Sequence, residues 1–99
     1  MAKYFLTNKA VEDLSKIWEY TYEVWSEGQA DKYYELLTNS FQNFVQNPEL
    51  GKNYDEIDKF IFGVCVGKHI VFYRMVQSND IEILRNLHQR MDLKNKIDE

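Results

Sequence analysis

The feature that most constrains the fold of this 99-residue chain is a change in the period of its apolar residues at Pro48. Before Pro48, apolar side chains recur every three or four residues, as they do on one face of an α-helix. After residue 58 they alternate with a period of two, as they do in β-strands. Because helical and strand-like parts follow one another, we predict an α+β fold in a single domain over residues 1–99.

The helical part predicts two helices of about 18 residues each. Thr7 or Asn8 can accept hydrogen bonds from the free N–H groups of the first helix, and we expect Gly28 to end that helix as a left-handed cap. The second helix ends at Asn47-Pro48, because proline cannot continue a helix. So short a connection makes the helices antiparallel. Their apolar faces are Ala10, Leu14, Ile17, Trp18, Thr21, Val24 and Trp25, and Ala30, Tyr33, Tyr34, Leu37, Phe41, Phe44 and Val45.

The strand-like part predicts a three-strand meander, joined by turns at Gly67-Lys68 and Ser78-Asn79-Asp80. A further strand precedes the first helix, and the polar residues 48–58 form a loop or a covering segment. The predicted strands cover residues 3–6, 60–66, 69–77 and 81–87. We therefore expect a helical hairpin packed on one face of a mainly antiparallel sheet.

The middle strand of the meander carries apolar side chains on both faces. Ile70, Phe72 and Val76 share one face, and Val71, Tyr73 and Met75 share the other. A helical hairpin covers only one face, and a sheet face in water is normally polar. We therefore expect an exposed apolar groove that binds a partner. In the alternative, the tail from residue 91 onward folds over that face.

Charge is divided unevenly along the chain. Residues 1–58 carry 11 acidic and 5 basic side chains, whereas residues 59–99 carry 5 acidic and 7 basic ones, with all three arginines and both histidines. The net charge of −4 disfavours a surface that neutralises a phosphate backbone, so we expect no direct sequence-specific binding of nucleic acid.

No apolar run approaches the roughly 20 residues of a membrane span, and no signal peptide is evident, so we expect no membrane contact and a cytoplasmic location.

No metal or cofactor is expected. The chain has no Cys-x-x-Cys or His-x-x-x-His spacing, and its four glycines are scattered rather than gathered in a phosphate-binding loop. We expect the single cysteine, Cys65, to be a small buried residue.

The end of the last predicted strand is the best candidate site. Alternation places Arg85 and Leu87 on one face and Asn86 and His88 on the other, and Arg74 on the neighbouring strand can join them. A histidine beside guanidinium groups can cleave RNA by general acid–base catalysis, with His88, Arg85 and Arg90 as the catalytic residues. Alternatively, His88 hydrogen-bonds to backbone while the arginines bind an acidic protein, since no second acid or base is predicted near His88.

Aromatic and acidic residues are both abundant in the helical hairpin. We expect most of the aromatic residues to be core or the interface between the two helices. We expect the acidic residues to form a solvated helix face. The aromatic residues are Trp18, Tyr20, Tyr22, Trp25, Tyr33 and Tyr34, and the acidic ones are Glu12, Asp13, Glu19, Glu23, Glu27, Asp31 and Glu35.

Several short motifs follow one another along nearly the whole chain. They are Tyr4-Phe5-Leu6-Thr7 with Ala10 and Asp13-Leu14, Trp25 with Gln29-Ala30 and Tyr33, Phe41 with Asn47-Pro48 and Gly51, Asp55-Glu56-Ile57, His69-Ile70-Val71-Phe72-Tyr73-Arg74, and the run from Ile81 to Asp92. In this order and spacing they resemble the ParE branch of the RelE/ParE superfamily, the toxins of bacterial type II toxin–antitoxin pairs.

The resemblance implies the fold predicted above and a cognate antitoxin that wraps the toxin with a helix and a strand, giving a hetero-oligomer. It also implies inhibition of DNA gyrase by binding rather than by catalysis. The RelE branch instead cuts mRNA on the ribosome, and the acidic residues within 53–58 disfavour that alternative because they repel RNA. An inert interaction module of the same fold is the third possibility. Lys59 stands where we expect an arginine in ParE-like toxins.

Two sets of site residues follow from these arguments. We also expect Arg85→Ala or Arg90→Ala to lower toxicity without unfolding the protein. The target-binding set is Arg74, Arg85, His88 and Arg90, and the antitoxin-binding set is Phe60, Phe62, Tyr73, Met75, Arg85 and Leu87.

Overall fold

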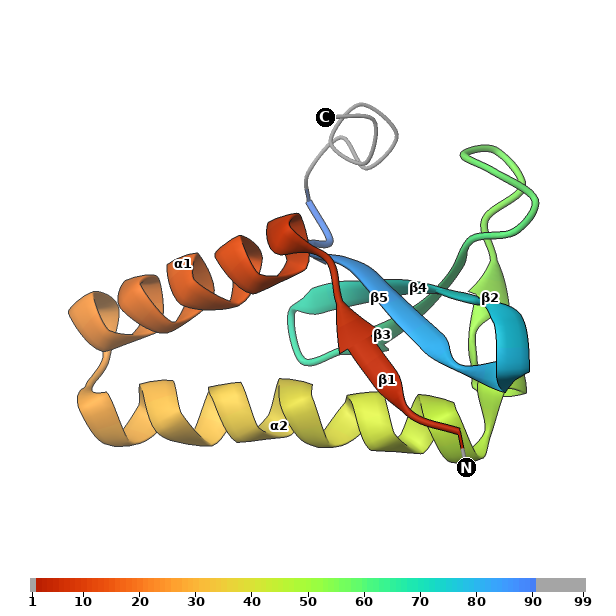
Figure 1. Ribbon diagram of the computed structural model, residues 1–99. Helices are drawn as coiled ribbons and strands as arrows, with labels where there is room; N and C mark the ends of the chain where they lie inside the picture. The colour runs from red at the N-terminus through yellow and green to blue at the C-terminus, as the bar shows by residue number, and fades with distance from the viewer. Residues whose placement is uncertain (1, 91–99) are drawn as a thin grey trace.

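A computed structural model describes residues 2–90 of the chain, in which a hairpin of two helices packs against a five-stranded sheet (Figure 1). The helices are α1 (Asn8–Val24) and α2 (Glu27–Gln46), and the strands are β1 (Tyr4–Leu6), β2 (Lys52–Asn53), β3 (Phe62–Val66), β4 (His69–Met75) and β5 (Ile81–His88), with 3-10 turns at Pro48–Leu50 and Gln77–Asn79. The predicted α+β class, helical hairpin and meander are confirmed. The tail from residue 91 onward lies outside the described residues.

The strand order in the sheet is β1-β5-β4-β3-β2. β1 pairs with β5 in parallel, and the other neighbours are antiparallel. Residues 48–58 were predicted as a loop or a covering segment, and Tyr54 and Ile57 do cover the sheet, but the short strand β2 also forms there and pairs with the first two residues of β3. The pairing of β4 with β5 shifts between Phe72, opposite Arg85, and Tyr73, opposite Ile83, so that Leu84 is an extra residue in β5. Such a β-bulge turns the following side chains relative to the sheet.

Thr7 joins the first strand, the first helix and β5. Its hydroxyl oxygen accepts a hydrogen bond from the Ala10 N–H at 3.1 Å, which confirms it as the N-terminal cap of α1. The same hydroxyl donates to the Leu84 carbonyl at 2.9 Å, and the Thr7 N–H donates to the Ile83 carbonyl at 3.1 Å. The start of α1 is thereby attached to the middle of β5.

The connection between the helices differs from the prediction. Ser26 is the N-terminal cap of α2, with its hydroxyl oxygen accepting from the Gln29 N–H at 3.1 Å. Gly28 therefore lies in the first turn of α2 and does not end α1, because a serine capping signal lies just before it. The predicted end of α2 at Asn47-Pro48 is confirmed.

Apolar residues are buried on both faces of the sheet. Toward the helices, Leu37, Phe41 and Phe44 of α2 pack with Val71 and Ile83 of the sheet. On the other face a second cluster contains Ile61, Ile70, Phe72 and Leu87, against which Tyr54, Ile57 and Leu84 pack.

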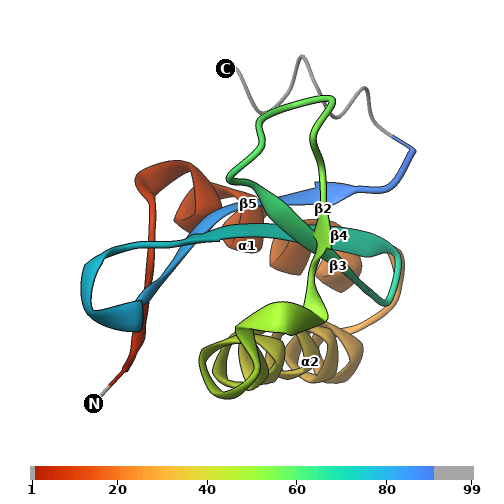
Figure 2. The same ribbon diagram turned by 90° about the vertical axis from the view of Figure 1, so that its right-hand side faces the viewer.

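The loop between β2 and β3 covers this second face, and Figure 2 shows it on the opposite side of the sheet from α2. Tyr54 in this loop makes an edge-to-face contact with Phe72, with ring centroids 5.1 Å apart. The prediction of an exposed apolar groove along Ile70 and Phe72 is therefore wrong, because the chain itself supplies the cover from residues 54–61.

The helical hairpin extends past the sheet, so that its connecting turn has no strand beneath it (Figure 1). Tyr20, Tyr22, Val24 and Trp25 are 66, 50, 53 and 68% exposed. The prediction that the hairpin aromatic residues are mostly core is therefore wrong for the far half of the hairpin. The helical period is correct there, but the apolar face has nothing to pack against.

Candidate functional site at the end of the last strand

Arg85 is held in an ion pair with Asp13 of α1. Its Nε donates to Asp13 Oδ2 at 2.8 Å and its Nη2 donates to Asp13 Oδ1 at 3.0 Å, while the Asn86 N–H also donates to Oδ2 at 3.0 Å. The two side chains are only 12 and 10% exposed. Asp13 thus departs from the predicted solvated face, and Arg85 fastens α1 to β5. We therefore expect Arg85→Ala to destabilise the fold, because the change leaves a buried carboxylate without its guanidinium partner.

His88 faces a second histidine. His69 is its direct partner on β4, and the two rings lie nearly perpendicular with centroids 5.4 Å apart. The Tyr33 hydroxyl of α2 lies 2.6 Å from His69 Nδ1 and accepts a hydrogen bond from the Lys68 N–H at 3.0 Å. The prediction that no second acid or base lies near His88 is therefore wrong.

The environment keeps His69 uncharged at neutral pH. The pKa of His69 is lowered to about 4, chiefly by burial and next by the neighbouring His88, while Asp13 opposes the shift. Burial also raises the pKa of Tyr33, so its hydroxyl keeps its proton. This arrangement fits a neutral imidazole whose Nδ1 accepts a hydrogen bond from the Tyr33 hydroxyl.

The strand end presents His88 and Arg90 next to each other. His88 is partly buried, and its Nδ1 accepts a hydrogen bond from the Arg90 N–H at 3.2 Å, which confirms the predicted alternative of a histidine bonded to backbone. The Arg90 side chain is exposed. An exposed guanidinium two residues beyond this imidazole can bind a carboxylate or phosphate of a partner.

Arg74 does not join this group. It lies near the opposite end of β4, five residues beyond His69, which is roughly 17 Å along a strand. Its Nε contacts Glu82 Oε1 at 2.6 Å, and its side chain is 50% exposed. The prediction that Arg74 joins the strand-end site is therefore wrong, because Arg74 and His88 lie at different ends of the β4–β5 hairpin.

The predicted antitoxin-binding residues fall into two groups. Phe60 and Met75 are 64 and 46% exposed, and Phe62 is partly buried. Tyr73 and Leu87 are buried and give a partner no access, so their assignment to a contact surface is wrong.

Tyr73 and Leu87 are buried for different reasons. The Tyr73 hydroxyl donates to the Pro48 carbonyl at 2.6 Å and accepts from the Gly51 N–H at 2.8 Å, so it secures the segment that follows α2. Leu87 belongs to the cluster beneath the loop between β2 and β3. Alternation of apolar residues does not predict that Tyr73 and Leu87 are buried, since their burial depends on the segment after α2 and on the loop between β2 and β3.

Within residues 2–90, no group of three or more His, Cys, Asp and Glu side chains is placed to hold a metal ion. No helix among the described residues is long and apolar enough to cross a membrane. Cys65, expected to be buried, is exposed. Lys59 lies in the loop before β3, with its Nζ 5.1 Å from the centre of the Phe60 ring.

The sequence matches known toxins over almost its full length. The family model of the ParE toxin of the type II toxin–antitoxin system parDE matches residues 4–93. The chain is 35% identical over 92 residues to Toxin ParE1 of Mycobacterium tuberculosis, covering 93% of this chain and 94% of that one. It is 31% identical over 94 residues to Toxin ParE1 of Caulobacter vibrioides, covering 95 and 96%.

Two solved structures share the fold. One is the chromosomal ParDE toxin–antitoxin system from P. aeruginosa, with a TM-score of 0.74, 19% identity and coverage of 89% of this chain and 95% of that one. The other is the toxin–antitoxin complex RelBE2 from Mycobacterium tuberculosis, with a TM-score of 0.63, 20% identity and coverage of 89 and 98%. Together with the family match over residues 4–93, the helical hairpin on its five-stranded sheet leads to one conclusion: the chain belongs to the ParE toxin family of type II toxin–antitoxin systems.

Proposed function

We propose that this toxin acts by binding DNA gyrase, without catalysis, and that a cognate antitoxin neutralises it in a hetero-oligomer. The observation that carries the proposal is the match of residues 4–93 to the ParE family, whose expected action is on gyrase. The strand end offers the exposed Arg90 beside His88 as the contact with the target. Arg85 contributes indirectly, by fixing β5 against α1.

Two features of the site favour binding over RNA cleavage. His69 is neutral at pH 7 and engaged by Tyr33, so it is poorly placed to supply a positive charge to a phosphate. Asp55, Glu56 and Asp58 are exposed in the loop between β2 and β3, where they repel an RNA backbone.

One observation favours mRNA cleavage as the second candidate. The His69–His88 pair places two imidazoles 5.4 Å apart beside Arg90, a set from which general acid–base catalysis can be built. In that case His88 transfers the proton and Arg90 stabilises the phosphorane, while Arg85 stays with Asp13.

The surface proposed for the antitoxin lies around β3. Phe60 and Met75 are exposed apolar side chains, and β2 pairs only with Phe62 and Gly63. Among the described residues no strand pairs with the rest of β3 on its β2 side. An added antitoxin strand can pair there, along Val64–Val66, while another part of the antitoxin covers Phe60 and Met75.

The test measures gyrase supercoiling and ribosome-bound mRNA side by side. We expect the purified toxin to inhibit supercoiling and to leave the message intact. Arg90→Ala should weaken inhibition by about tenfold, as truncation of an arginine that dominates an interface does, whereas the matched Arg74→Ala should not change it. Circular dichroism checks that both variants fold.

Three results contradict this proposal. Cleaved message with unaffected gyrase establishes the endonuclease instead. No effect in either assay, with harmless overexpression, leaves an inert module of the same fold. Equal weakening by Arg74→Ala and Arg90→Ala removes the strand end as the contact site.

A further inference from the structure

The far half of the helical hairpin, which the sheet does not cover, carries a second surface unrelated to the strand end. Trp18 and Tyr22, one turn apart on α1, stack with ring centroids 5.3 Å apart and planes 14° apart. Trp25 follows two turns beyond Trp18 and is 68% exposed, and Tyr34 on α2 is 42% exposed. We call the surface formed by Trp18, Tyr22, Trp25, Asp31, Tyr34 and Glu35 the distal hairpin face.

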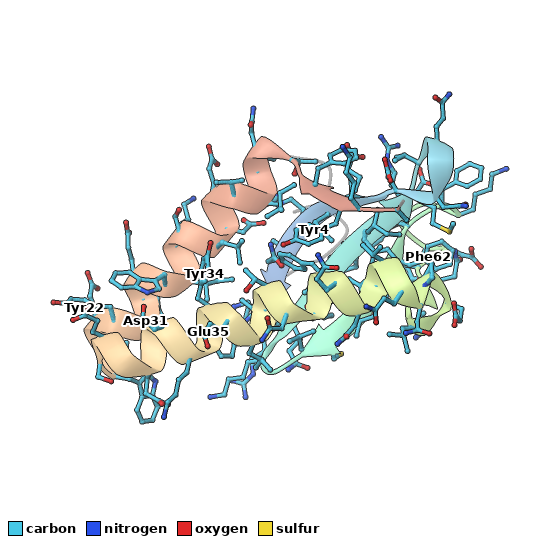
Figure 3. All side chains as sticks on the ribbon, turned by 60° about the horizontal axis from the view of Figure 1, so that its bottom comes forward. Tyr4, Tyr22, Asp31, Tyr34, Glu35 and Phe62 are labelled. Carbon is cyan, nitrogen blue, oxygen red and sulfur yellow. The ribbon has the colours of Figure 1, made fainter. Side chains whose placement is uncertain are left out.

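Acidic residues are interleaved with these rings. Asp31 of α2 accepts a hydrogen bond from Trp18 Nε1 at 3.0 Å, which ties the two helices together across the face. Tyr34 and Glu35 lie one turn further along α2, on the same side as Asp31. Figure 3 shows Tyr22, Asp31, Tyr34 and Glu35 together on the half of the hairpin that lies away from the sheet.

The charge of this region is strongly one-sided. Between residues 16 and 35 the exposed acidic side chains outnumber the basic ones by five to two. They are Glu19, Glu23, Glu27, Asp31 and Glu35, against Lys16 and Lys32. Exposed aromatic rings among carboxylates attract cations by two routes at once, since a cation is drawn to a ring face and pairs with a carboxylate.

We propose that the distal hairpin face binds a cationic segment of a partner protein, with arginine side chains stacked on the Trp18–Tyr22 pair and on Trp25 and paired with Asp31 and Glu35. Arginine fits better than lysine, because its planar guanidinium stacks on aromatic rings and forms two parallel hydrogen bonds with a carboxylate. Tryptophan, tyrosine and arginine are also the residues that most often dominate the energy of protein interfaces.

A second copy of this chain is a poorer occupant. Two of its three arginines are already engaged by carboxylates, Arg74 by Glu82 and Arg85 by Asp13. Of the arginines in a second copy, this leaves Arg90 to reach the distal hairpin face without breaking one of these pairs, whereas the proposed segment supplies several. A separate cationic segment carries no such cost.

Both tryptophans of the chain lie on this face, so binding can be followed directly by their fluorescence. The probe is a fluorescein-labelled 12-residue peptide with an arginine at every third position, compared with matched peptides carrying lysine or glutamine there. We expect saturable binding of the arginine peptide to the full chain, seen in peptide anisotropy and in tryptophan emission. The lysine peptide should bind more weakly, and the glutamine peptide should not bind.

Substitutions locate the binding surface. Trp25→Ala, Tyr22→Ala and Glu35→Gln should each weaken binding of the arginine peptide by about two- to fivefold. The matched control is Phe5→Ala on β1, whose ring is 41% exposed and outside this face, and it should leave binding unchanged. Circular dichroism checks that each variant is folded.

Three outcomes overturn the proposal. Equal binding of the three peptides removes the requirement for a cation. Equal weakening by Phe5→Ala and Trp25→Ala removes the face as the site. Concentration-dependent dimerisation in sedimentation equilibrium that Trp25→Ala abolishes shows that a second copy is the occupant. None of these measurements involves gyrase, so they test the face independently of the proposed action on that enzyme.

Discussion

The two halves of the helical hairpin have the same sequence pattern and different surroundings. In the half on the sheet, Leu14, Leu37 and Phe41 are 5, 0 and 0% exposed. In the far half, Val24 and Trp25 continue the same period and are 53 and 68% exposed. The period of a helix therefore shows which side chains share a face, but burial of that face depends on whether another element reaches it.

The difference also separates stability from recognition. Side chains in the half on the sheet are removed from water when the protein folds, so substitutions there change the free energy of unfolding. Side chains in the far half gain little on folding and are available to a partner. The first two predictions that follow compare a change in the half on the sheet with a change in the far half, and the last two compare a change in β4 or in the turn before it with a change in the far half.

The largest contrast is between two aromatic residues. Phe41→Ala should lower the free energy of unfolding by about 3–5 kcal/mol, because it opens a cavity beside Tyr4 and Phe44. Trp25→Ala should change it by less than about 0.5 kcal/mol. Urea denaturation measures both, and a loss at Trp25 comparable to that at Phe41 would show that the far half is packed in solution.

The next contrast is between two aspartates. Asp13→Ala leaves the Arg85 guanidinium and the Asn86 N–H without this carboxylate in a nearly closed site, so it should cost about 3 kcal/mol. Asp31→Ala removes an exposed hydrogen bond to Trp18 and should cost less than about 1 kcal/mol. Equal losses in urea denaturation would contradict the structural role given to Asp13.

The third contrast is in the dependence of stability on pH. His69 takes up a proton near pH 6.5 in the unfolded chain but only at about pH 4 in the folded one, so the unfolded state binds more protons in between. Its contribution is complete above about pH 6.5 and is lost as the pH falls toward 4, by on the order of 2 kcal/mol.

His69→Asn tests this pH dependence, since asparagine keeps an acceptor for Tyr33 without a titrating group. The free energy of unfolding of this variant should vary less between pH 7 and 4.5 than that of the wild type. Trp25→Ala should keep the wild-type dependence. An unchanged slope in His69→Asn would assign the acid sensitivity to other groups.

The smallest contrast is between two glycines, whose substitution by alanine should change the free energy of unfolding in opposite directions. Gly67 has φ of +61°, and an added Cβ would lie 2.7 Å from the Tyr33 ring, so Gly67→Ala should destabilise the protein by about 1–2 kcal/mol. Gly28 lies in the first turn of α2 with open space around it, so Gly28→Ala should stabilise by about 0.5 kcal/mol. Thermal unfolding measures both changes, and destabilisation by Gly28→Ala as well as by Gly67→Ala would contradict the assignment of Gly28 to the helix.

Much of the fold could be predicted from local signals. Thr7 and Pro48 mark helix ends by their own chemistry, and Gly67 marks a turn by its positive φ. The boundary between the helices was missed, because Ser26 and Gly28 signal a start and an end within three residues. β2 was missed because two residues carry no period.

The site was harder to predict than the fold. The approach of His88 to His69 depends on the register of β4 and β5, which shifts by one residue at the bulge. The pairing of Arg85 with Asp13 joins residues far apart in the chain. Alternation assigned Arg85 and His88 to opposite faces, but it contains no information on which residues of the helices each side chain meets.

Local sequence signals specify the two helices, the meander and their order, because capping, proline and apolar period act over a few residues. The sequence by itself also determined family membership through motifs spread over residues 4–93. Tertiary structure alone decided which apolar residues are covered, since the loop with Tyr54 closes one sheet face and nothing in residues 2–90 closes the distal hairpin face. It also decided the roles of the arginines, because an ion pair depends on distance and burial, and neither is a local property of the chain.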